Sequence, residues 1–174
     1  IIISKKAAPI KRATPFTQED IYKLWLHQDD LTVRIILINI YTGVRLNELL
    51  NMKVDDIHLK ERYMVGGSKT DAGRDRIIPI AECIVPFVQE LYSTAKFKRS
   101  MHLFDGVMGK TNYRGRLASV CEKLGIKKRK PHDTRHTISP LCSSYELPEI
   151  IVQLIVGPAT SKNIHQGVNT QKTI

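Results

Sequence analysis

Four residues in three separated segments have the types and the spacing of a site that binds and cleaves a phosphodiester. Arg45 follows Tyr-Thr-Gly-Val, Lys69 lies in Ser-Lys-Thr-Asp, and His132 and Arg135 lie in Pro-His-Asp-Thr-Arg-His-Thr. An arginine offers phosphate two charge-assisted hydrogen bonds from a planar group that stays charged. A lysine can protonate a leaving oxygen, and a histidine can donate to phosphate or carry a proton. Together these types predict cations that hold the phosphate oxygens while negative charge develops.

The first two of these residues are expected at the ends of short elements. Arg45 should begin a short helix just after a turn at Gly43, where backbone N–H groups also favour anions. Glu48 lies three residues further along the same helical face and is expected to hold the Arg45 guanidinium. Lys69 is expected in the turn of a β-hairpin, from which a lysine can reach into a groove.

The last two residues should share one face of a helix, because they are three positions apart. His132 and Arg135 are therefore expected to point at the same ligand. Asp133 and His136 in the same string should face elsewhere and have structural roles.

In this order, the three segments resemble the catalytic domain of the tyrosine recombinases, the phage integrase family, over about residues 15–174. The resemblance implies a mainly helical fold with a small antiparallel three-stranded sheet. It also implies site-specific DNA recombination or integration through a 3′-phosphotyrosyl intermediate. Arg45, His132 and Arg135 would then bind the scissile phosphate, and Lys69 would protonate the leaving 5′ oxygen.

Two positions depart from the family pattern. The family has His or Trp where this chain has Pro158, and its nucleophilic tyrosine falls at Asn169. Proline has no side-chain donor for a phosphate, and an amide is too weak a nucleophile to form a phospho-linkage. The sequence therefore predicts a chain that binds DNA but is disarmed for cleavage. Whether the two residues are natural or engineered stays open.

Several alternatives remain. The chain is a non-catalytic DNA-binding module on the recombinase fold, a variant made to trap a complex, or an enzyme that uses another tyrosine, Tyr41, Tyr113 or Tyr145. A type IB topoisomerase shares the chemistry but needs the same missing tyrosine. A generic basic protein, such as an RNA-binding factor, is the remaining hypothesis.

Further basic residues are expected to neutralise phosphates that flank the cleavage site. A solvated basic loop is the alternative interpretation. The predicted DNA-binding residues are Arg114, Arg116, Lys127, Lys128, Arg129 and Lys130.

The surrounding pattern predicts helices around a short sheet. A capping box at 17–20 should begin the first helix, and the apolar helix 32–41 should end at Gly43. Strands are expected at 62–65 and 76–80, with turns at 66–67 and 71–73. Further helices are expected at 45–52, 82–94, 112–124, 132–144, 148–156 and 161–168.

Composition limits the class of partner. The 174 residues carry a net charge of +10 and are 42% hydrophobic, which is typical of a globular domain that meets a polyanion. No apolar run approaches the ~18 residues of a transmembrane helix. Double-stranded DNA is therefore the expected partner, with no membrane and a cytoplasmic location in a bacterium or a mobile element. A homo-oligomer, a tetramer on DNA, is implied by the resemblance alone.

Domain limits and cofactors complete the expectations. Residues 1–16 should be a linker from a missing N-terminal DNA-binding domain, and 17–174 a catalytic domain without its C-terminal docking segment. Neither a cofactor nor a metal is expected, because arginine and lysine supply the electrophilic groups that Mg²⁺ supplies elsewhere. Three widely spaced cysteines, without a paired motif, should be reduced and structural: Cys83, Cys121 and Cys142.

Overall fold

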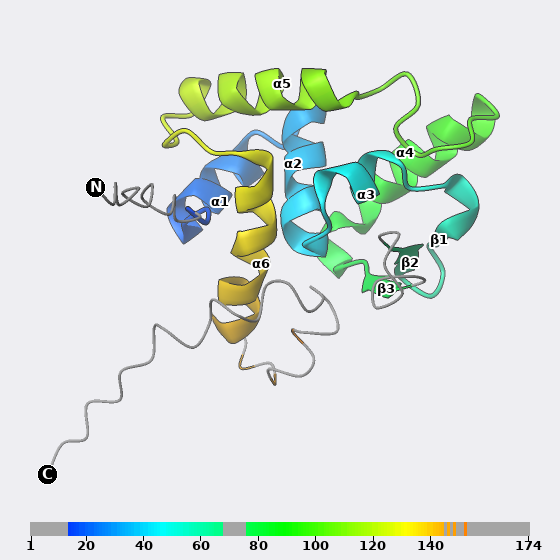
Figure 1. Cartoon of the computed structure of the whole chain (residues 1–174), viewed down its shortest axis with the longest axis horizontal. Helices are drawn as coiled ribbons and strands as arrows, with labels where there is room; N and C mark the ends of the chain where they lie inside the picture. Colours follow the sequence, from blue (N-terminus) through cyan, green and yellow to red (C-terminus); the bar gives the residue numbers. More distant parts are fainter. Residues whose placement is uncertain (1–13, 68–75, 145, 147, 149–151, 153–174) are drawn as a thin grey trace, which may run out of the picture.

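One apolar helix forms the centre of the protein. The computed structural model describes residues 14–67 and 76–144, together with 146, 148 and 152. Helix α2 (Leu31–Thr42) contains a run of isoleucines and leucine that is fully buried, and four other helices pack around it (Figure 1). These are α1 (Gln18–Leu26), α4 (Val85–Phe97), α5 (Lys110–Lys123) and α6 (Pro131–Ser144).

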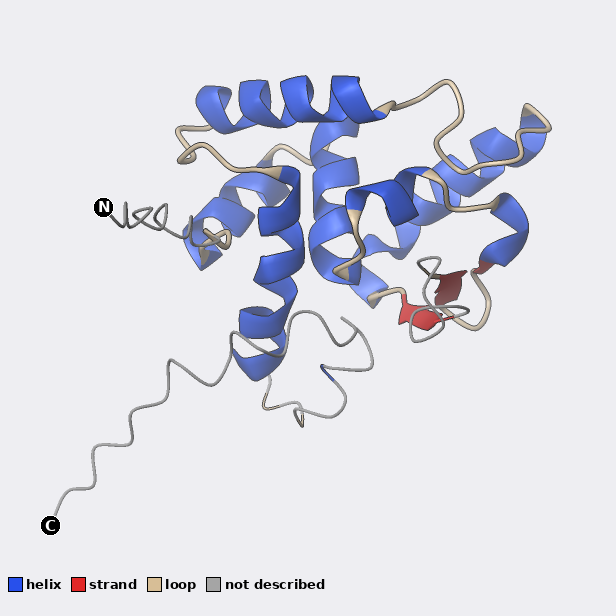
Figure 2. Ribbon diagram, viewed as in Figure 1, coloured by secondary structure: helices blue, strands red, loops and turns tan. Residues whose placement is uncertain are grey.

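A small sheet lies at the end of the molecule away from α1 (Figure 2). Its strands β1 (Ile57–His58), β2 (Tyr63–Gly66) and β3 (Arg76–Pro79) run antiparallel in that order. Met64 pairs with both Ile57 and Ile78, and this face of the sheet is buried. The predicted mainly helical fold with a three-stranded antiparallel sheet is confirmed. Gly66, expected in a turn, instead pairs with Arg76 at the end of β2.

The helix ends follow their local sequence signals. Thr17 and Asp20 form the predicted capping box of α1, with hydrogen bonds of 3.1 and 3.0 Å. Gly43 ends α2 with φ of 61°, and a Cβ there would lie 2.7 Å from Ile138 of α6. A glycine is thus required both by the left-handed backbone and by the close approach of α6. The short helix α3 (Leu46–Leu50) follows this turn.

Four further elements differ slightly from the sequence expectations. Two short 3₁₀ helices, Val54–Asp56 and Glu82–Ile84, precede β1 and α4. Helix α5 begins at Lys110, earlier than expected, and α6 begins at Pro131, where proline is favourable because the first N–H groups of a helix have no intrahelical acceptor. Pro140 lies inside α6 and is exposed.

Residues just before α1 belong to the folded domain. The amide of Thr14 donates to Asp133 at 3.2 Å, and the amide of Phe16 donates to the Thr137 hydroxyl at 3.0 Å. Phe16 is also part of the hydrophobic core. These contacts tie the chain to α6, so the last three residues of the expected 1–16 linker are packed on the domain.

Several predictions fall outside the described residues. They include Lys69, Pro158, Asn169, the helix expected at 161–168 and most of the helix expected at 148–156, of which Val152 is described as helical and its amide donates to the Pro148 carbonyl at 3.2 Å. Within the part that the structure describes, no helix is both long enough and apolar enough to cross a membrane.

Candidate phosphate-binding site

A groove of about 600 Å³ brings together residues from three separated parts of the chain. It lies where α3, the first half of α5 and the beginning of α6 meet. The side chains that line it are mostly cationic: Arg45, Leu46, Asn47, Lys110, Arg114, Ala118, Lys128, Arg129, Lys130, Pro131 and His132.

Arg45 lies at the N-cap of α3, as its sequence context predicts. Its backbone amide donates to Glu48 at 2.8 Å, and its guanidinium lies 3.8 Å from the same carboxylate. Arg76 of β3 approaches that carboxylate at 3.6 Å. Glu48 is therefore shared by two arginines, and the Arg45 side chain, 42% exposed, remains accessible from the groove.

Arg76 was not among the residues singled out from the sequence. The alternation of β3 does place it on the inner face, because Arg76 and the buried Ile78 are two residues apart while Ile77 points outward. Burial, together with the charge of Arg45, lowers the pKa of Arg76. A strand arginine on an inward position was the signal available in the sequence.

Arg135 is almost completely buried, at 2% exposure. It donates to the Gly43 carbonyl at 2.7 Å, so α6 is tied to the turn that precedes Arg45. Burial and the positive charges of Arg45 and Arg76 lower its pKa to about 10, against the attraction of Glu48. The three arginines and Glu48 thus form one electrostatic group with an excess of positive charge.

His132 is exposed at the first turn of α6 and lines the groove beside Arg45. Burial, followed by the charges of Arg135 and Arg45, lowers its pKa. Its ring meets the ring of His136 edge to face, with centroids 4.6 Å apart. His136 was expected to face elsewhere and instead packs against the candidate ligand, whereas Asp133 is structural and accepts from the amides of Thr14 and Lys130.

The five predicted DNA-binding residues that are exposed separate into two groups. Arg114, Lys128 and Lys130 are exposed and line the groove, together with Lys110, which sequence reasoning missed because α5 was expected to begin later. Arg116 and Lys127 are exposed but do not line it.

Arg129 differs from its neighbours in the basic loop, residues 127–130. Its side chain is only 3% exposed and donates to Asp20 of α1 at 2.5 Å. Although burial alone would raise the pKa of Asp20, hydrogen bonds from Arg129 and Thr17 lower it. Arg129 therefore anchors the loop to α1, and its assignment as a DNA-binding residue stays a prediction.

The structure describes two of the alternative tyrosine nucleophiles, and both pack in or against the hydrophobic core. Tyr113 is fully buried, its hydroxyl donates to Asn39 at 3.2 Å, and burial raises its pKa. Tyr41 is half-buried and accepts from Trp25 at 3.1 Å. A buried phenol with a raised pKa is a poor attacking group. Tyr145 lies outside the described residues.

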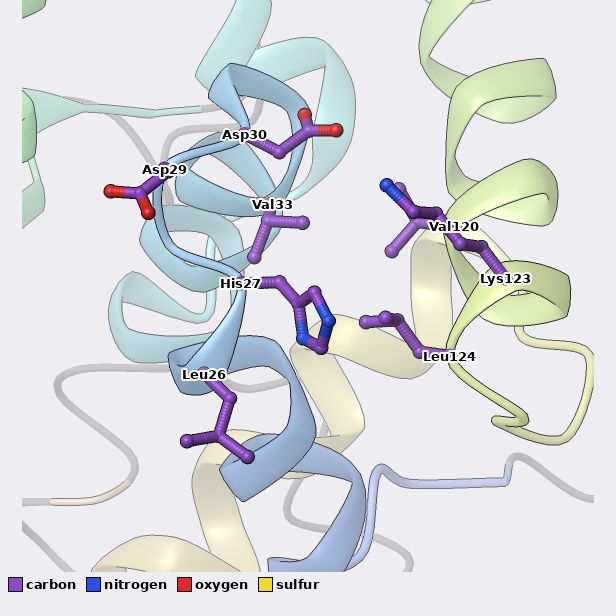
Figure 3. Close-up of a pocket in the computed structure, with 8 residues that line it drawn as sticks. All are labelled: Leu26, His27, Asp29, Asp30, Val33, Val120, Lys123 and Leu124. Carbon is purple, nitrogen blue, oxygen red and sulfur yellow. The ribbon is translucent and has the colours of Figure 1, made fainter.

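A second, smaller hollow of about 180 Å³ lies between the α1–α2 turn and the end of α5. In Figure 3 the His27 ring points toward Leu124 across it, and the Asp29 carboxylate points away. Its lining includes Asp29 and Asp30 and one lysine, Lys123, so it does not offer phosphate a cationic site. No three metal-ligating side chains gather anywhere in the described part of the chain, and its three cysteines are free thiols.

Comparison with known proteins agrees with this geometry. Residues 4–161 match the phage integrase family. The tyrosine recombinase XerA of Pyrococcus horikoshii is 26% identical over 91% of this chain and 61% of its own length. XerA of Pyrococcus furiosus is 30% identical over 83% of this chain and 53% of its own length. The chain thus spans little more than half of these relatives.

Solved structures share the fold. A crystal structure of XerA recombinase superimposes with a TM-score of 0.72 at 22% identity, covering 92% of this chain and 62% of that one. The Tn1549 transposon integrase, in complex with transposon right end DNA, gives 0.74 at 18% identity, covering 93% and 64%. With the family match extending over most of the sequence, the chain belongs to the phage integrase family of tyrosine recombinases.

Proposed function

We propose that this chain is the catalytic-domain part of a site-specific DNA recombinase, and that it holds a DNA phosphate without cleaving it. The observation that carries the proposal is the gathering of Arg45 and His132 on one groove, with Arg135 electrostatically coupled to both. An anion in this position would relieve the repulsion among these cations. Arg114, Lys110, Lys128 and Lys130 would then bind the flanking phosphates of duplex DNA.

In the family reaction, a tyrosine oxygen attacks phosphorus, and the bond from phosphorus to the 5′ oxygen breaks. The proposed ligands for the non-bridging oxygens are Arg45, Arg135 and His132, and Lys69 is the proposed proton donor to the 5′ oxygen. Asn169 supplies no oxygen nucleophile and Pro158 no donor, so the proposal ends at the bound phosphate. A cytoplasmic site of action and a tetramer on DNA belong to the same proposal.

Covalent trapping on nicked duplex DNA, followed on a denaturing gel, tests both parts of the proposal: that the chain has the recombinase site and that it does not cleave DNA. We expect no adduct with the unaltered chain and an adduct with the Asn169→Tyr, Pro158→His double variant. An adduct with the unaltered chain would show that another residue attacks. The failure of both proteins, with duplex binding intact, would leave a DNA-binding module whose loss of chemistry extends beyond these two positions.

Equilibrium binding tests the groove itself. Arg45→Ala should weaken binding to a short duplex, whereas Lys96→Ala should not. The second change removes an equal charge from α4, where Lys96 pairs with Asp55 of the 3₁₀ helix Val54–Asp56 at the exposed surface. Equal losses for the two variants would mean that binding follows net charge. A preference for single-stranded RNA over duplex DNA would favour the RNA-binding alternative.

A further inference from the structure

A buried asparagine joins the three segments that carry the arginines of the proposed site. Asn39 lies in the middle of α2, between Ile38 and Ile40, and all three side chains are fully buried. A leucine or isoleucine would suit this position by packing alone. The presence of an amide therefore requires an explanation from its partners.

The partners of Asn39 come from three different elements. Its Oδ1 accepts from the hydroxyls of Thr134 at 2.6 Å and Tyr113 at 3.2 Å, and its Nδ2 donates to the Val44 carbonyl at 3.0 Å. Because a carbonyl cannot donate, the amide orientation follows from these partners. One side chain thus connects α2 with α5, α6 and the turn before α3.

Each partner immediately precedes an arginine of the proposed site. Val44 precedes Arg45, Tyr113 precedes Arg114 and Thr134 precedes Arg135. The hydrogen bond at each preceding residue restricts where the backbone of the following arginine lies, and so restricts where its side chain can reach.

The turn before Arg45 is held most firmly. The Gly43 carbonyl accepts from Arg135 at 2.7 Å, and the next carbonyl, that of Val44, accepts from Asn39. The Gly43 amide donates to the Asn39 carbonyl at 3.1 Å, which closes the end of α2. Consecutive peptide groups are thus fixed by a site arginine and by Asn39.

We propose that Asn39 is a positioning residue that sets the relative placement of Arg45, Arg114 and Arg135 for the DNA backbone. The proposal rests on the proposed function, because it assigns these arginines to DNA phosphates. Buried hydrogen bonds in a region of low dielectric resist displacement, so a polar junction holds three segments in one arrangement where apolar contacts permit several. Precise placement matters because charge-assisted bonds to phosphate are directional.

The test compares Asn39→Leu with Thr42→Val. Thr42 is also fully buried on α2, but among the described residues its hydroxyl donates only to Ile38 one turn earlier, at 2.7 Å, and joins no other segment. Affinity for a short fluorescent duplex of mixed sequence is measured over a range of salt, at a temperature where urea unfolding shows every variant to be folded. Asn39→Leu should weaken binding about 10-fold and reduce the salt slope by about 1, and Thr42→Val should change binding by less than about 2-fold.

Coupling to Arg45 separates positioning from stability. In an Arg45→Ala background, Asn39→Leu should weaken duplex binding by about 3-fold or less. The Arg45 guanidinium, one of the groups that Asn39→Leu displaces, is already absent there. An undiminished cost, or an effect no larger than that of Thr42→Val, would overturn the inference. A wild-type chain that does not bind the duplex would instead overturn the proposed function.

Tyr113→Phe provides a second variant if Asn39→Leu does not fold. It removes one hydroxyl from the junction and keeps the ring in the core. We expect binding about 3-fold weaker than wild type, with the loss absent in an Arg114→Ala background. An equal loss in both backgrounds would overturn the inference.

Discussion

Two buried arginines, one just before and one just after the start of α6, have different electrostatic surroundings. Arg129 lies beside a carboxylate, whereas Arg135 lies near two other arginines. Arg129 donates to the carboxylate of Asp20, and this pair joins the basic loop to α1. Arg135 donates to a backbone carbonyl, and burial, followed by the charges of Arg45 and Arg76, lowers its pKa to about 10. The comparison teaches that burial alone does not separate a structural arginine from a functional one. The charges around the guanidinium do, because the positive charges of Arg45 and Arg76 near Arg135 favour the binding of an anion there.

The largest expected effect is on the structural side of this comparison. Asp20→Asn leaves the buried Arg129 guanidinium without its carboxylate, which should lower the free energy of unfolding by about 3–5 kcal/mol, measured by urea unfolding. Glu19→Gln is the control, since Glu19 pairs with Lys23 at the exposed surface of the same helix and should change stability by less than about 0.5 kcal/mol.

The pH dependence of this difference has a defined sign. The pKa of Asp20 is lowered in the folded state, so its contribution is complete above the unfolded value of 3.8 and is lost as the pH falls through the folded value. The stability difference between wild type and Asp20→Asn should therefore shrink below about pH 4. A difference that stays constant into acid would mean that the loss comes from packing.

The next largest effect is expected at Arg135 and concerns DNA binding. Arg135→Met should weaken duplex binding about 30-fold, because hydrogen bonds to charged groups contribute about 2 kcal/mol. The same change should alter the free energy of unfolding by less than Asp20→Asn does, since the repulsion from Arg45 and Arg76 that it removes offsets part of the loss of the bond to Gly43 and of the attraction to Glu48. A stability loss as large as that of Asp20→Asn, without a binding defect, would reverse the comparison.

His132 should link binding to protons. Burial and the neighbouring arginines lower its pKa in the free protein, and a bound phosphate would offset those charges and raise the pKa. Binding should thus take up a proton and strengthen as the pH falls. His132→Gln should reduce the gain in affinity between about pH 7.5 and pH 5.5 by about 5-fold, as measured by binding titrations at matched ionic strength. An unchanged pH profile would exclude a protonated His132 as a phosphate ligand.

Local signals predicted the parts of the fold that depend on neighbouring residues. The capping box at Thr17, the glycine end of α2 and the helix position of His132 and Arg135 are each confirmed, because each depends on a few adjacent positions. The roles of Arg129 and Asn39 were not predictable in this way. Their partners, Asp20, Thr134 and Tyr113, lie far away in sequence, and only the packed arrangement brings them together.

The smallest expected effects lie at the exposed rim and test whether the groove, rather than the basic loop as a whole, faces DNA. Lys127 and Lys128 are neighbours in sequence and both exposed, but only Lys128 lines the groove. Lys128→Ala should weaken duplex binding about 2-fold to 3-fold and reduce the slope of affinity against salt by about 1, whereas Lys127→Ala should leave the slope unchanged. Slopes are measured by titration at several salt concentrations. Equal slopes for the two variants would mean that the loop acts as a diffuse positive charge, and that directed phosphate contacts are confined to the arginines fixed by the fold.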